Sequence, residues 1–342
     1  MKILVIGSDK IFAIENFYVK SLRQLGVEVY QFPAQSFFYD YYQKDFINKL
    51  IFKTGFSTIY KVINKRLKRA VNEFNPDILW VFKGMEIFPA TLIWAKNLGI
   101  ILVSFNPDNP FLFSGKGSGN KNVTDSIGLY HLHFTYNLEI KTRLENEFMA
   151  RTAWLPFGYN IEDEVFTVAI QQNETCELCF LGNPDKERSM FILALANKGI
   201  QISVYGHNWN RFLAHSNIAI HSPVYGVEQW KVLRRYRAQL NLMRPHNERS
   251  HNMRTFEVPG IGGIMVAPDT IEHRMFFETD QEVFLFRDVE ECVTKVKWLL
   301  QLSKQEADEI RKRARERSLR SGYSYQVRSQ QVVTELNNLM GR

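Results

Sequence analysis

A stretch of polar and glycine residues in the second half of the chain carries side chains suited to an anionic ligand. Within 249–268, RSHNMRTFEVPGIGGIMVAP, the polar residues are Asn252, Arg254 and Glu257, followed by Gly262 and Gly263 and an apolar run. Arg254 can bind a phosphate with two parallel hydrogen bonds. Glu257, three residues later on the same helix face, can accept hydrogen bonds from both hydroxyls of a ribose. Glycines let a backbone approach a ligand closely. The stretch therefore predicts a binding site for a nucleoside diphosphate.

Two basic segments could add positive charge to this site. The first segment, residues 244–251, overlaps the start of this stretch and contributes Arg244, Arg249 and His251. We expect a helix to begin near Ser250 or His251, with Ser250 as the N-cap, so that its free N–H groups attract phosphate. The second segment, GNPDKER at 182–188, places Lys186 and Arg188 at the start of another helix, where they could meet the same phosphates.

Both segments also have a simpler explanation. Arg254 and Glu257 could form a surface pair that stabilises a helix by about 0.3–0.5 kcal/mol. The 182–188 segment could be a solvated first helical turn. We favour a binding site because both segments follow expected strands, and open α/β sheets bind ligands outside the carboxyl ends of their strands.

The elements that must position these residues alternate along the chain. The expected strands are 2–7, 27–32, 78–82, 100–105 and 129–136, then 177–182, 201–206, 238–243, 263–268 and 282–286. Helical patterns lie between them, which predicts an α/β fold with parallel sheets covered on both faces. The region 154–175 interrupts this alternation with Pro, Gly, Asn and polar residues. We therefore expect two consecutive α/β domains and a closing C-terminal helix.

Candidates for acid–base chemistry lie in the first half. Asp108 follows the strand expected at 100–105, in FNPDNP, and a carboxylate there could act as a general base. The same sequence also favours an Asx turn before Pro110, which is the structural alternative. His131 is the next candidate. It would share one strand face with His133, and the pair could equally line a cleft or pack.

Several familiar motifs are missing. The expected first strand is followed by Gly7, Ser8, Asp9 and Lys10, without the glycine pattern of dinucleotide-binding proteins. Cys176 and Cys179 form a C-x-x-C, but no second cysteine pair exists that would complete a zinc site. We expect no metal site.

Composition narrows the class of protein. The 342 residues suffice for two domains, and the net charge of +7 with a pI of about 9.1 indicates anionic partners. Three cysteines and a first strand directly after Met1, with no signal-peptide pattern, favour the cytoplasm. The sequence contains no run of about 18 apolar residues, so it predicts no membrane-spanning helix.

The segment 45–74 has a pattern of its own. Eight Lys or Arg residues between Lys44 and Arg69 alternate with Ile, Leu, Phe and Val. A basic amphipathic helix of this kind can lie on an anionic membrane, here at its inner face, and would suit a lipid-linked acceptor. The alternative, which we favour, is a solvated helix that packs its apolar side on the first domain.

The motifs FLGNPDKER, VYGHNW and NMRTFEVPGIGGIMVAP, with DTIEHRMFFETDQEVFLFRDVEE at 269–291, resemble the carboxyl-terminal half of CgeB/YkvP-like glycosyltransferases. FNPDNPF at 105–111 is similar to an element of their first domain. The resemblance covers most of the chain and is strongest between about 178 and 300.

The resemblance implies a GT-B fold, in which two Rossmann-like domains face each other across a cleft. The domains would be 1–160 for the acceptor and 161–320 for the nucleotide-sugar donor, with a helix over 321–342 that could cross back to the first domain. UDP-sugars are the favoured donors, the chemistry needs no metal, and the acceptor is a glycan, a lipid-linked molecule or a protein. Such enzymes build bacterial polysaccharides or surface glycans.

The resemblance also assigns residues. Glu257 would hold the ribose, Asn252 and Arg254 would face the diphosphate or sugar, Arg188 would come from the first loop of the donor domain, and Asp108 would face the cleft. Arg188, Arg254 and Arg244 would stabilise the leaving group. Retaining members often carry two glutamates with seven residues between them; here the first position is Arg249, next to Glu248, so the stereochemistry stays open.

Three other functions remain as alternatives. A non-catalytic protein could keep the fold and bind sugar nucleotides, and an epimerase of UDP-sugars would need no acceptor. The basic pI allows a nucleic-acid-modifying transferase, but the basic residues are dispersed and no nucleic-acid motif is present, so nucleic acid is disfavoured as a partner.

Overall fold

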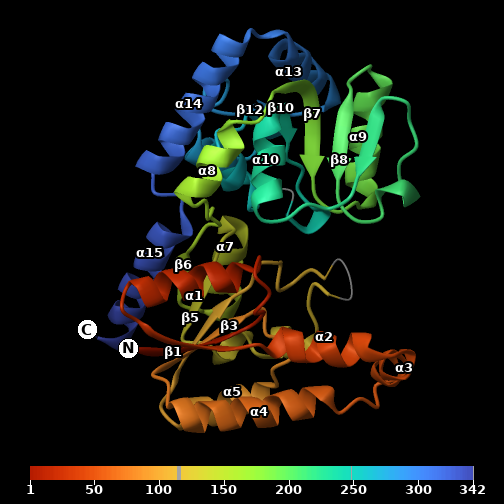
Figure 1. The fold of residues 1–342 in the computed structure, drawn as a ribbon. Coiled ribbons are helices and arrows are strands. Elements are labelled where there is room, and N and C mark those ends of the chain that lie inside the picture. The colour runs from red at the N-terminus through yellow and green to blue at the C-terminus, as the bar shows by residue number, and fades with distance from the viewer. Residues whose placement is uncertain (114–116, 248, 342) are drawn as a thin grey trace. The chain divides into compact units, whose positions relative to one another are not determined.

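The protein consists of two compact α/β units (Figure 1). The computed structural model describes residues 1–113, 117–247 and 249–341. The first unit comprises Met1–Pro156 and the chain from Tyr325 on, and the second comprises Phe157–Ser324. Each unit contains one six-stranded parallel sheet. The α/β architecture predicted from the alternation of strands and helices is confirmed.

The first sheet has the strand order β2-β1-β3-β4-β5-β6. Its strands are β1 (Lys2–Ile6), β2 (Glu28–Phe32), β3 (Ile78–Phe82), β4 (Ile101–Phe105), β5 (Leu132–Thr135) and β6 (Thr152–Trp154). The helices of this unit are α1 (Ile14–Gln24), α2 (Ala34–Lys44), α3 (Phe46–Lys53), α4 (Ile59–Phe74), α5 (Pro89–Asn97), α6 (Lys121–Asp125), the short 3-10 helix η1 (Ile127–Leu129), α7 (Leu138–Phe148) and α15 (Tyr325–Met340).

Alternate residues of the first sheet pack on different helices. Leu4 and Leu79 belong to a core that α4 and α5 cover with residues such as Leu67. On the other side, Tyr18 of α1 packs against Trp80 and against Tyr325 of α15, with ring centroids 5.1 and 5.2 Å apart. Figure 1 shows α4 and α5 on one side of the sheet and α1 with α15 on the other. The C-terminal helix is therefore a structural part of the first unit.

The second sheet has the order β12-β11-β10-β7-β8-β9. Its strands are β7 (Thr175–Leu181), β8 (Ile202–Tyr205), β9 (Ile218–His221), β10 (Tyr236–Leu240), β11 (Met265–Pro268) and β12 (Phe284–Phe286). The helices are α8 (Asp163–Ile170), α9 (Lys186–Asn197), η2 (Trp209–Arg211), α10 (Val227–Arg235), η3 (Pro245–Asn247), α11 (Arg254–Gly260), α12 (Ile271–Phe276), α13 (Val289–Gln301) and α14 (Lys304–Arg320).

All ten expected strands are present, and two were missed. The missed strands, β6 and β9, form one edge of each sheet. Both are short and only partly buried, so they lack the continuous apolar run of a central strand. The expected linker 154–175 is also partly structured, because it contains the last residue of β6 and all of α8. The segment 45–74 is two helices, α3 and α4, and not one.

In each sheet there is one point, the switch point, at which the chain stops adding strands on one side and continues on the other. In the first sheet, β1 lies between β2 and β3; in the second, β7 lies between β8 and β10. Ligands of open α/β sheets bind at such switch points, outside the carboxyl ends of the strands. The loops after β1 and β3, and those after β7 and β10, are therefore where a site is expected.

A buried ion network connects β10 and α14 of the second unit to the residue that precedes β7. Glu174, just before β7, accepts hydrogen bonds from Arg237 of β10 at 2.7 and 2.8 Å and also from Arg311 of α14. Both arginines are almost fully buried. Burial alone would raise the pKa of Glu174, but the two guanidinium groups lower it to about 2. The carboxylate thus stays charged and neutralises two buried cations.

We predict that Glu174→Ala lowers the free energy of unfolding by about 3–5 kcal/mol, because it leaves the buried Arg237 guanidinium without its carboxylate and Arg311 with Asp308 alone. Urea denaturation followed by circular dichroism measures this difference. Glu28→Ala, which breaks an exposed pair with Lys2, is the matched control and should cost less than about 1 kcal/mol. Equal losses in the two variants would contradict the role of the network.

Candidate functional site

The loops after β7 and β10 meet at the switch point of the second sheet. The loop after β7 runs through Gly182 and Asn183 to α9, and the loop after β10 runs from Asn241 to α11. Asp185 caps α9 by accepting a hydrogen bond from the Arg188 N–H at 2.9 Å. Glycine is needed at position 206, because a Cβ there would collide with the Gly182 carbonyl, which accepts a hydrogen bond from the Trp209 indole.

Arg188 bridges these two loops. Its Nη2 donates to the Leu242 carbonyl at 2.7 Å, and its Nη1 donates to the Asn183 carbonyl at 3.2 Å. The side chain is buried, and its Nε lies 3.4 Å from a carboxylate oxygen of Asp185. The start of α9 at Lys186 agrees with the expected position, but Arg188 points into the protein whereas Lys186 is exposed. Arg188 therefore belongs to the switch point, not to a solvated first turn.

Arg254 and Glu257 lie on the helix that begins at this edge. α11 starts at Arg254, and Arg254 Nη1 forms an ion pair with Glu257 Oε2, as in the simpler explanation of this segment. Arg254 Nε lies 3.5 Å from the Leu181 carbonyl at the end of β7. The Glu257 carboxylate is almost completely buried. The pair is consequently held between the two central strands and not on an open surface.

Positive charge accumulates at this switch point. Burial lowers the pKa of Arg188; Asp185 opposes this effect and the charge of Arg244 adds to it, so that the pKa lies at about 10. The pKa of Arg254 is also lowered to about 10, by burial and by the charge of Arg188. Both guanidinium groups keep their protons at neutral pH and repel one another. A polyanion bound here would relieve the repulsion.

The approach to α11 differs from the expectation. The helix begins four residues later than Ser250, and Ser250 is not its N-cap. Ser250 is buried and donates to Glu272, as does His251, whose Nδ1 lies 2.6 Å from a Glu272 oxygen. His251 Nε2 accepts the Phe157 N–H at 3.3 Å, so its other nitrogen carries the proton. The expectations that Ser250 caps the helix and that His251 adds positive charge to the site are wrong, because both side chains are buried in this network.

Asn252 takes over the capping role. Its Oδ1 accepts the Thr255 N–H at 3.3 Å, and its Nδ2 donates to Asn241 Oδ1 at 2.8 Å, at the end of β10. Thr255 in turn bonds His273 Nε2 at 3.0 Å. Burial lowers the pKa of His273 to about 4, which keeps this imidazole neutral. Asn252 thus fixes the start of α11, and with it the position of Arg254.

Gly262 and Gly263 lie at the opposite end of α11, before the start of β11. Gly262 adopts the left-handed conformation (φ 73°) that reverses the chain after the helix. A Cβ on Gly263 would stand 2.6 Å from Gln239 Oε1 and 2.9 Å from Val258. Both glycines are therefore explained by a turn and by close packing. The expectation that they approach the ligand is wrong, because they lie at the amino end of the strands.

The two other arginines of this segment are exposed. Arg244 is exposed in the loop after β10 and contributes its charge to Arg188. Arg249 is exposed as well, and Glu248 lies outside the described residues. Among the described residues, no group of three or more His, Cys, Asp or Glu side chains is placed to hold a metal ion.

In the first unit, Asp108 lies in the loop after β4 and pairs with Lys83 from the loop after β3. Lys83 Nζ is 2.6 Å from Asp108 Oδ2, and it also donates to the Gly117 carbonyl. The expected Asx turn exists, but Asn106 makes it by accepting the Asp108 N–H at 3.0 Å, and Asn109 accepts the Phe111 N–H at 2.9 Å. The Asx turn here therefore does not depend on the Asp108 carboxylate.

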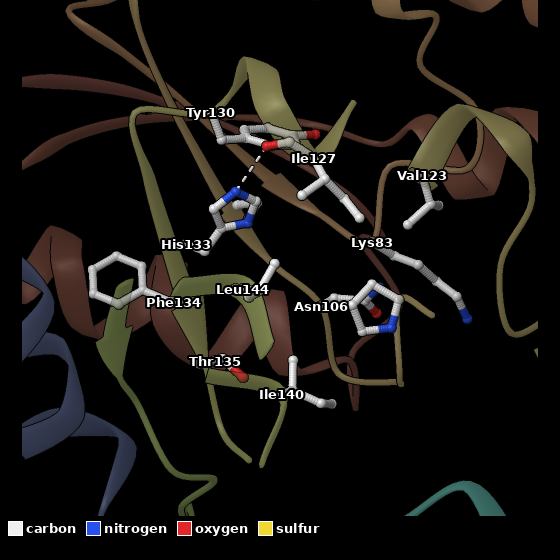
Figure 2. Close-up of a pocket in the computed structure, with 12 residues that line it drawn as sticks. Lys83, Asn106, Val123, Ile127, Tyr130, His133, Phe134, Thr135, Ile140 and Leu144 are labelled. Carbon is white, nitrogen blue, oxygen red and sulfur yellow. Dashed lines mark hydrogen bonds between the residues drawn. The ribbon is translucent and has the colours of Figure 1, made fainter. Parts of the chain in front are cut away.

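The two histidines occupy different places, and neither joins Asp108. His131 precedes β5, at the amino end of the sheet, where its Nδ1 accepts the Leu102 N–H at 2.9 Å. Its pKa is lowered by burial and by Lys96. His133 is buried in a pocket behind β4 and β5 (Figure 2), with Ser104 Oγ at 2.7 Å and the Ile127 carbonyl at 2.9 Å. The structure does not bring His131 to the edge where Asp108 lies.

The pocket around His133 is small and mixed in character. Figure 2 shows Lys83 and Asn106 on one side of it and Tyr130 with His133 on the other. The volume that the centres of water molecules can occupy in it is about 30 Å³. This is enough for one or two waters and too little for a sugar. Burial lowers the pKa of His133 to about 4, so this imidazole is neutral. His133 is a satisfied core residue and not an acid–base group.

A cluster of charged residues at the switch point of the first sheet was not expected from the sequence. Lys83 and Gly84 follow β3 with φ values of 63° and 87°, so two consecutive residues are left-handed. Strain at a non-glycine residue such as Lys83 often marks a functional position. Near Lys83 lie Glu86, whose pKa burial raises to about 7, and Glu15, whose pKa burial raises to about 6. A left-handed lysine and two separate glutamates form no sequence motif that could have revealed them.

Glu15 also occupies the place of a phosphate. In dinucleotide-binding sheets, the loop after the first strand binds a phosphate group. Here the Ser8 N–H of that loop donates to Glu15 Oε1 at 2.9 Å, and a Cβ on Gly7 would collide with the same carboxylate. The chain's own carboxylate thus fills this position in the first unit, whereas the corresponding region of the second unit carries arginines.

Comparison with known proteins supports a glycosyltransferase. Residues 187–334 match the family described as "Glycosyl transferase-like", and the matched part includes Arg188, Arg254 and Glu257. No curated protein matches the chain in sequence.

The fold resembles solved structures over the whole chain. Sucrose-phosphate synthase from Thermosynechococcus elongatus has a TM-score of 0.69 at 9% identity, and the likeness covers 100% of this chain and 99% of that one. Alr3699/HepE from Anabaena in complex with UDP has a TM-score of 0.66 at 12% identity, over 99% and 100% of the two chains. For the UDP-GlcNAc 2-epimerase from Neisseria meningitidis bound to UDP-GlcNAc, the values are 0.57 and 14%, over 99% and 100%. The architecture is that of GT-B glycosyltransferases, as expected. The narrower likeness to CgeB/YkvP proteins stays a prediction.

We predict that Glu86→Gln stabilises the protein at high pH and not at low pH. Because the folded state holds the Glu86 proton up to about pH 7, against an ordinary pKa of 4.5, the wild type loses stability as the pH rises between these values. The variant does not, so its advantage in free energy of unfolding should grow to about 3 kcal/mol at pH 8. Urea denaturation at pH 4 and pH 8 measures it. The exposed Glu28→Gln is the control, and a pH-independent difference for Glu86→Gln would contradict the burial of a proton.

Proposed function

We propose that this protein is a glycosyltransferase that takes a sugar from a nucleoside-diphosphate sugar, with UDP as the favoured nucleotide. The donor binds at the switch point of the second sheet. The observation that carries this proposal is the convergence of Arg188, Arg254 and Arg244 at that point, where the described residues place two carboxylates, Asp185 and Glu257, against three positive charges. A diphosphate supplies the missing negative charge.

Each residue of the site has a distinct proposed role. Arg188 and Arg254 bind the diphosphate, and Arg244 reaches it from the loop. Glu257 exchanges its ion pair with Arg254 for hydrogen bonds from the ribose hydroxyls. Asn252 holds the start of α11 in place. The solved UDP complex of Alr3699/HepE, which has the same fold, supports the choice of UDP.

The chemistry follows from this placement of charge. The oxygen of an acceptor hydroxyl forms a bond with the anomeric carbon, while the bond from that carbon to the β-phosphate oxygen breaks. The electron pair leaves with the nucleoside diphosphate, and the guanidinium groups stabilise the negative charge that develops on it. The proposed reaction draws this stabilisation from the chain's own arginines and needs no metal ion.

The acceptor proton needs a base, and we propose Asp108 in the first unit. Its carboxylate accepts from Lys83, which orients it, and the neighbouring asparagines make the turns that could otherwise have required it. Glu86 is the second candidate, because a carboxyl group with a pKa of about 7 is suited to proton transfer near neutral pH. We propose that the first unit binds the acceptor, since Glu15 already fills its phosphate position.

An epimerase is the second candidate function, since solved UDP-GlcNAc 2-epimerases share the fold. The match to the glycosyl transferase-like family favours transfer to an acceptor. A product that forms from the UDP-sugar without any acceptor would support the epimerase. Donor binding without turnover under all conditions would support a non-catalytic binding protein.

We predict that UDP binds and stabilises the protein, and that Glu257→Gln weakens UDP binding about 10- to 100-fold, since hydrogen bonds to a charged acceptor contribute about 1.5–3 kcal/mol. The same variant should leave the binding of inorganic diphosphate unchanged. Arg188→Lys should weaken both ligands, because the two-pronged contact is lost. Isothermal titration calorimetry with the two ligands measures these affinities.

The exposed Arg287→Ala serves as the charge control for this experiment. A thermal-shift panel of UDP, GDP, ADP, CMP and TDP identifies the base, because a ligand at 100 times its Kd stabilises by about 2.7 kcal/mol. Equal UDP affinity in Glu257→Gln and wild type would remove the ribose assignment. No binding of any nucleoside diphosphate would remove the donor site and reopen the nucleic-acid alternative.

We predict that Asp108→Asn lowers kcat at least 100-fold with little change in the Kd of UDP, because the base is lost and the donor site remains. A pH–rate profile separates the two candidate bases. If Asp108→Asn keeps the wild-type kcat while Glu86→Gln abolishes an ionisation near pH 7, Glu86 is the base.

A further inference from the structure

An exposed apolar surface on the first unit has no role in the proposed reaction. It consists of Phe46, Ile47 and Leu50 of α3 together with Phe56 in the following loop, which we call the α3 patch. Their side chains are exposed by 75, 65, 50 and 83%, respectively. None of the eight residues of α3 is fully buried. A helix with this composition is unusual on a surface that contacts only water.

The α3 helix is nevertheless firmly attached along its other side. Phe52 packs on Phe38, Tyr42 and Tyr60 with ring centroids 4.8, 5.6 and 5.7 Å apart. Asp45 caps the helix by accepting the Asn48 N–H at 2.6 Å. Figure 1 shows α3 at the end of α2, away from the sheet of the first unit. The exposed side chains are therefore held in a fixed arrangement and are not frayed chain.

Positive charge surrounds this patch. Lys44 and Lys53 are exposed, and Lys49 is partly exposed. The exposed side of α4 adds Lys61 and Lys65. Asp45 is the only acidic residue between Lys44 and Lys65. Apolar side chains flanked by lysines match the surface of a bilayer that contains anionic lipids, where acyl chains lie below negatively charged headgroups.

α4 itself does not provide the contact. Its apolar residues Ile63, Leu67 and Val71 are buried in the core of the first unit. The prediction that the apolar side of 45–74 packs on the first domain is thus confirmed for α4. It is wrong for α3, whose apolar side stays exposed. Among the described residues, no helix is long and apolar enough to cross a membrane.

We propose that the α3 patch docks on the surface of an anionic lipid bilayer, with Phe46, Ile47, Leu50 and Phe56 inserted between the headgroups and the surrounding lysines bound to lipid phosphates. This contact is independent of the donor site. It would bring the first unit, and with it the proposed acceptor site, to a lipid surface.

Sedimentation with liposomes tests this docking. The full-length protein should bind vesicles of phosphatidylcholine with 30% phosphatidylglycerol at low salt, and bind pure phosphatidylcholine at least tenfold more weakly. A patch variant with Phe46→Gln, Ile47→Gln, Leu50→Gln and Phe56→Gln should require at least tenfold more lipid for half-saturation. Because these side chains are exposed, its circular dichroism and its affinity for UDP should equal those of the wild type.

Two further variants separate the contributions. Lys44→Gln, Lys49→Gln and Lys53→Gln together should weaken binding to the anionic vesicles and reduce its dependence on salt. Met149→Ser with Ile271→Ser removes two equally exposed apolar side chains elsewhere and should bind like the wild type. No binding of the wild type to anionic vesicles overturns the proposal. Unchanged binding of the patch variant also overturns it, as does a wild-type dimer in solution that the patch variant converts to a monomer.

Discussion

The repulsion between two guanidinium groups, Arg188 buried and Arg254 partly buried, is the constraint on which the second unit depends. Arg188 and Arg254 come from segments 66 residues apart, and both lose water at the carboxyl ends of β7 and β10. Removing such a charge from water costs several kcal/mol even after relaxation. Backbone carbonyls at Leu242, Asn183 and Leu181 accept their hydrogen bonds. Asp185 and Glu257 provide one carboxylate to each arginine, and Arg244 adds a third positive charge nearby. The fold tolerates this cost, which is reasonable if a polyanion completes the site.

The buried network around α11 explains how that arrangement is maintained. Glu272, His251 and Ser250 fix the chain before the helix, and Asn252 with Thr255 fixes its first turn. Because these groups satisfy each other, the position of Arg254 does not depend on the ligand. The network at Glu174 likewise fixes side chains at the amino ends of the strands, where the Glu174 carboxylate binds Arg237 and Arg311. Carboxylates thus pair with arginines at both ends of the second sheet: Glu174 does so at the amino ends of the strands, and Asp185 with Glu257 does so at the carboxyl ends.

The sequence was sufficient for the architecture because central parallel strands are continuous apolar runs, and all ten of these were recognised. It was also sufficient for Arg188, Arg254 and Glu257, because polar residues after such strands must lie at the ligand-binding edge. It failed where tertiary contacts decide. Whether Ser250 caps a helix or is buried against Glu272, and whether Gly263 approaches a ligand or Gln239, depends on neighbours 22 and 24 residues away along the chain. The edge strands β6 and β9 were missed because they are short and half exposed.

The two units use the same topology with opposite electrostatics. In both sheets the first strand of the unit lies at the switch point, and in both the following loop offers backbone donors. In the first unit a carboxylate, Glu15, occupies those donors, and a phosphate would meet its negative charge. In the second unit Asp185 uses only the helix cap, while arginines line the loop. Under the proposed function, this single acidic side chain disfavours a nucleotide phosphate in the first unit and leaves its sheet edge, with Lys83 and Asp108, for the acceptor.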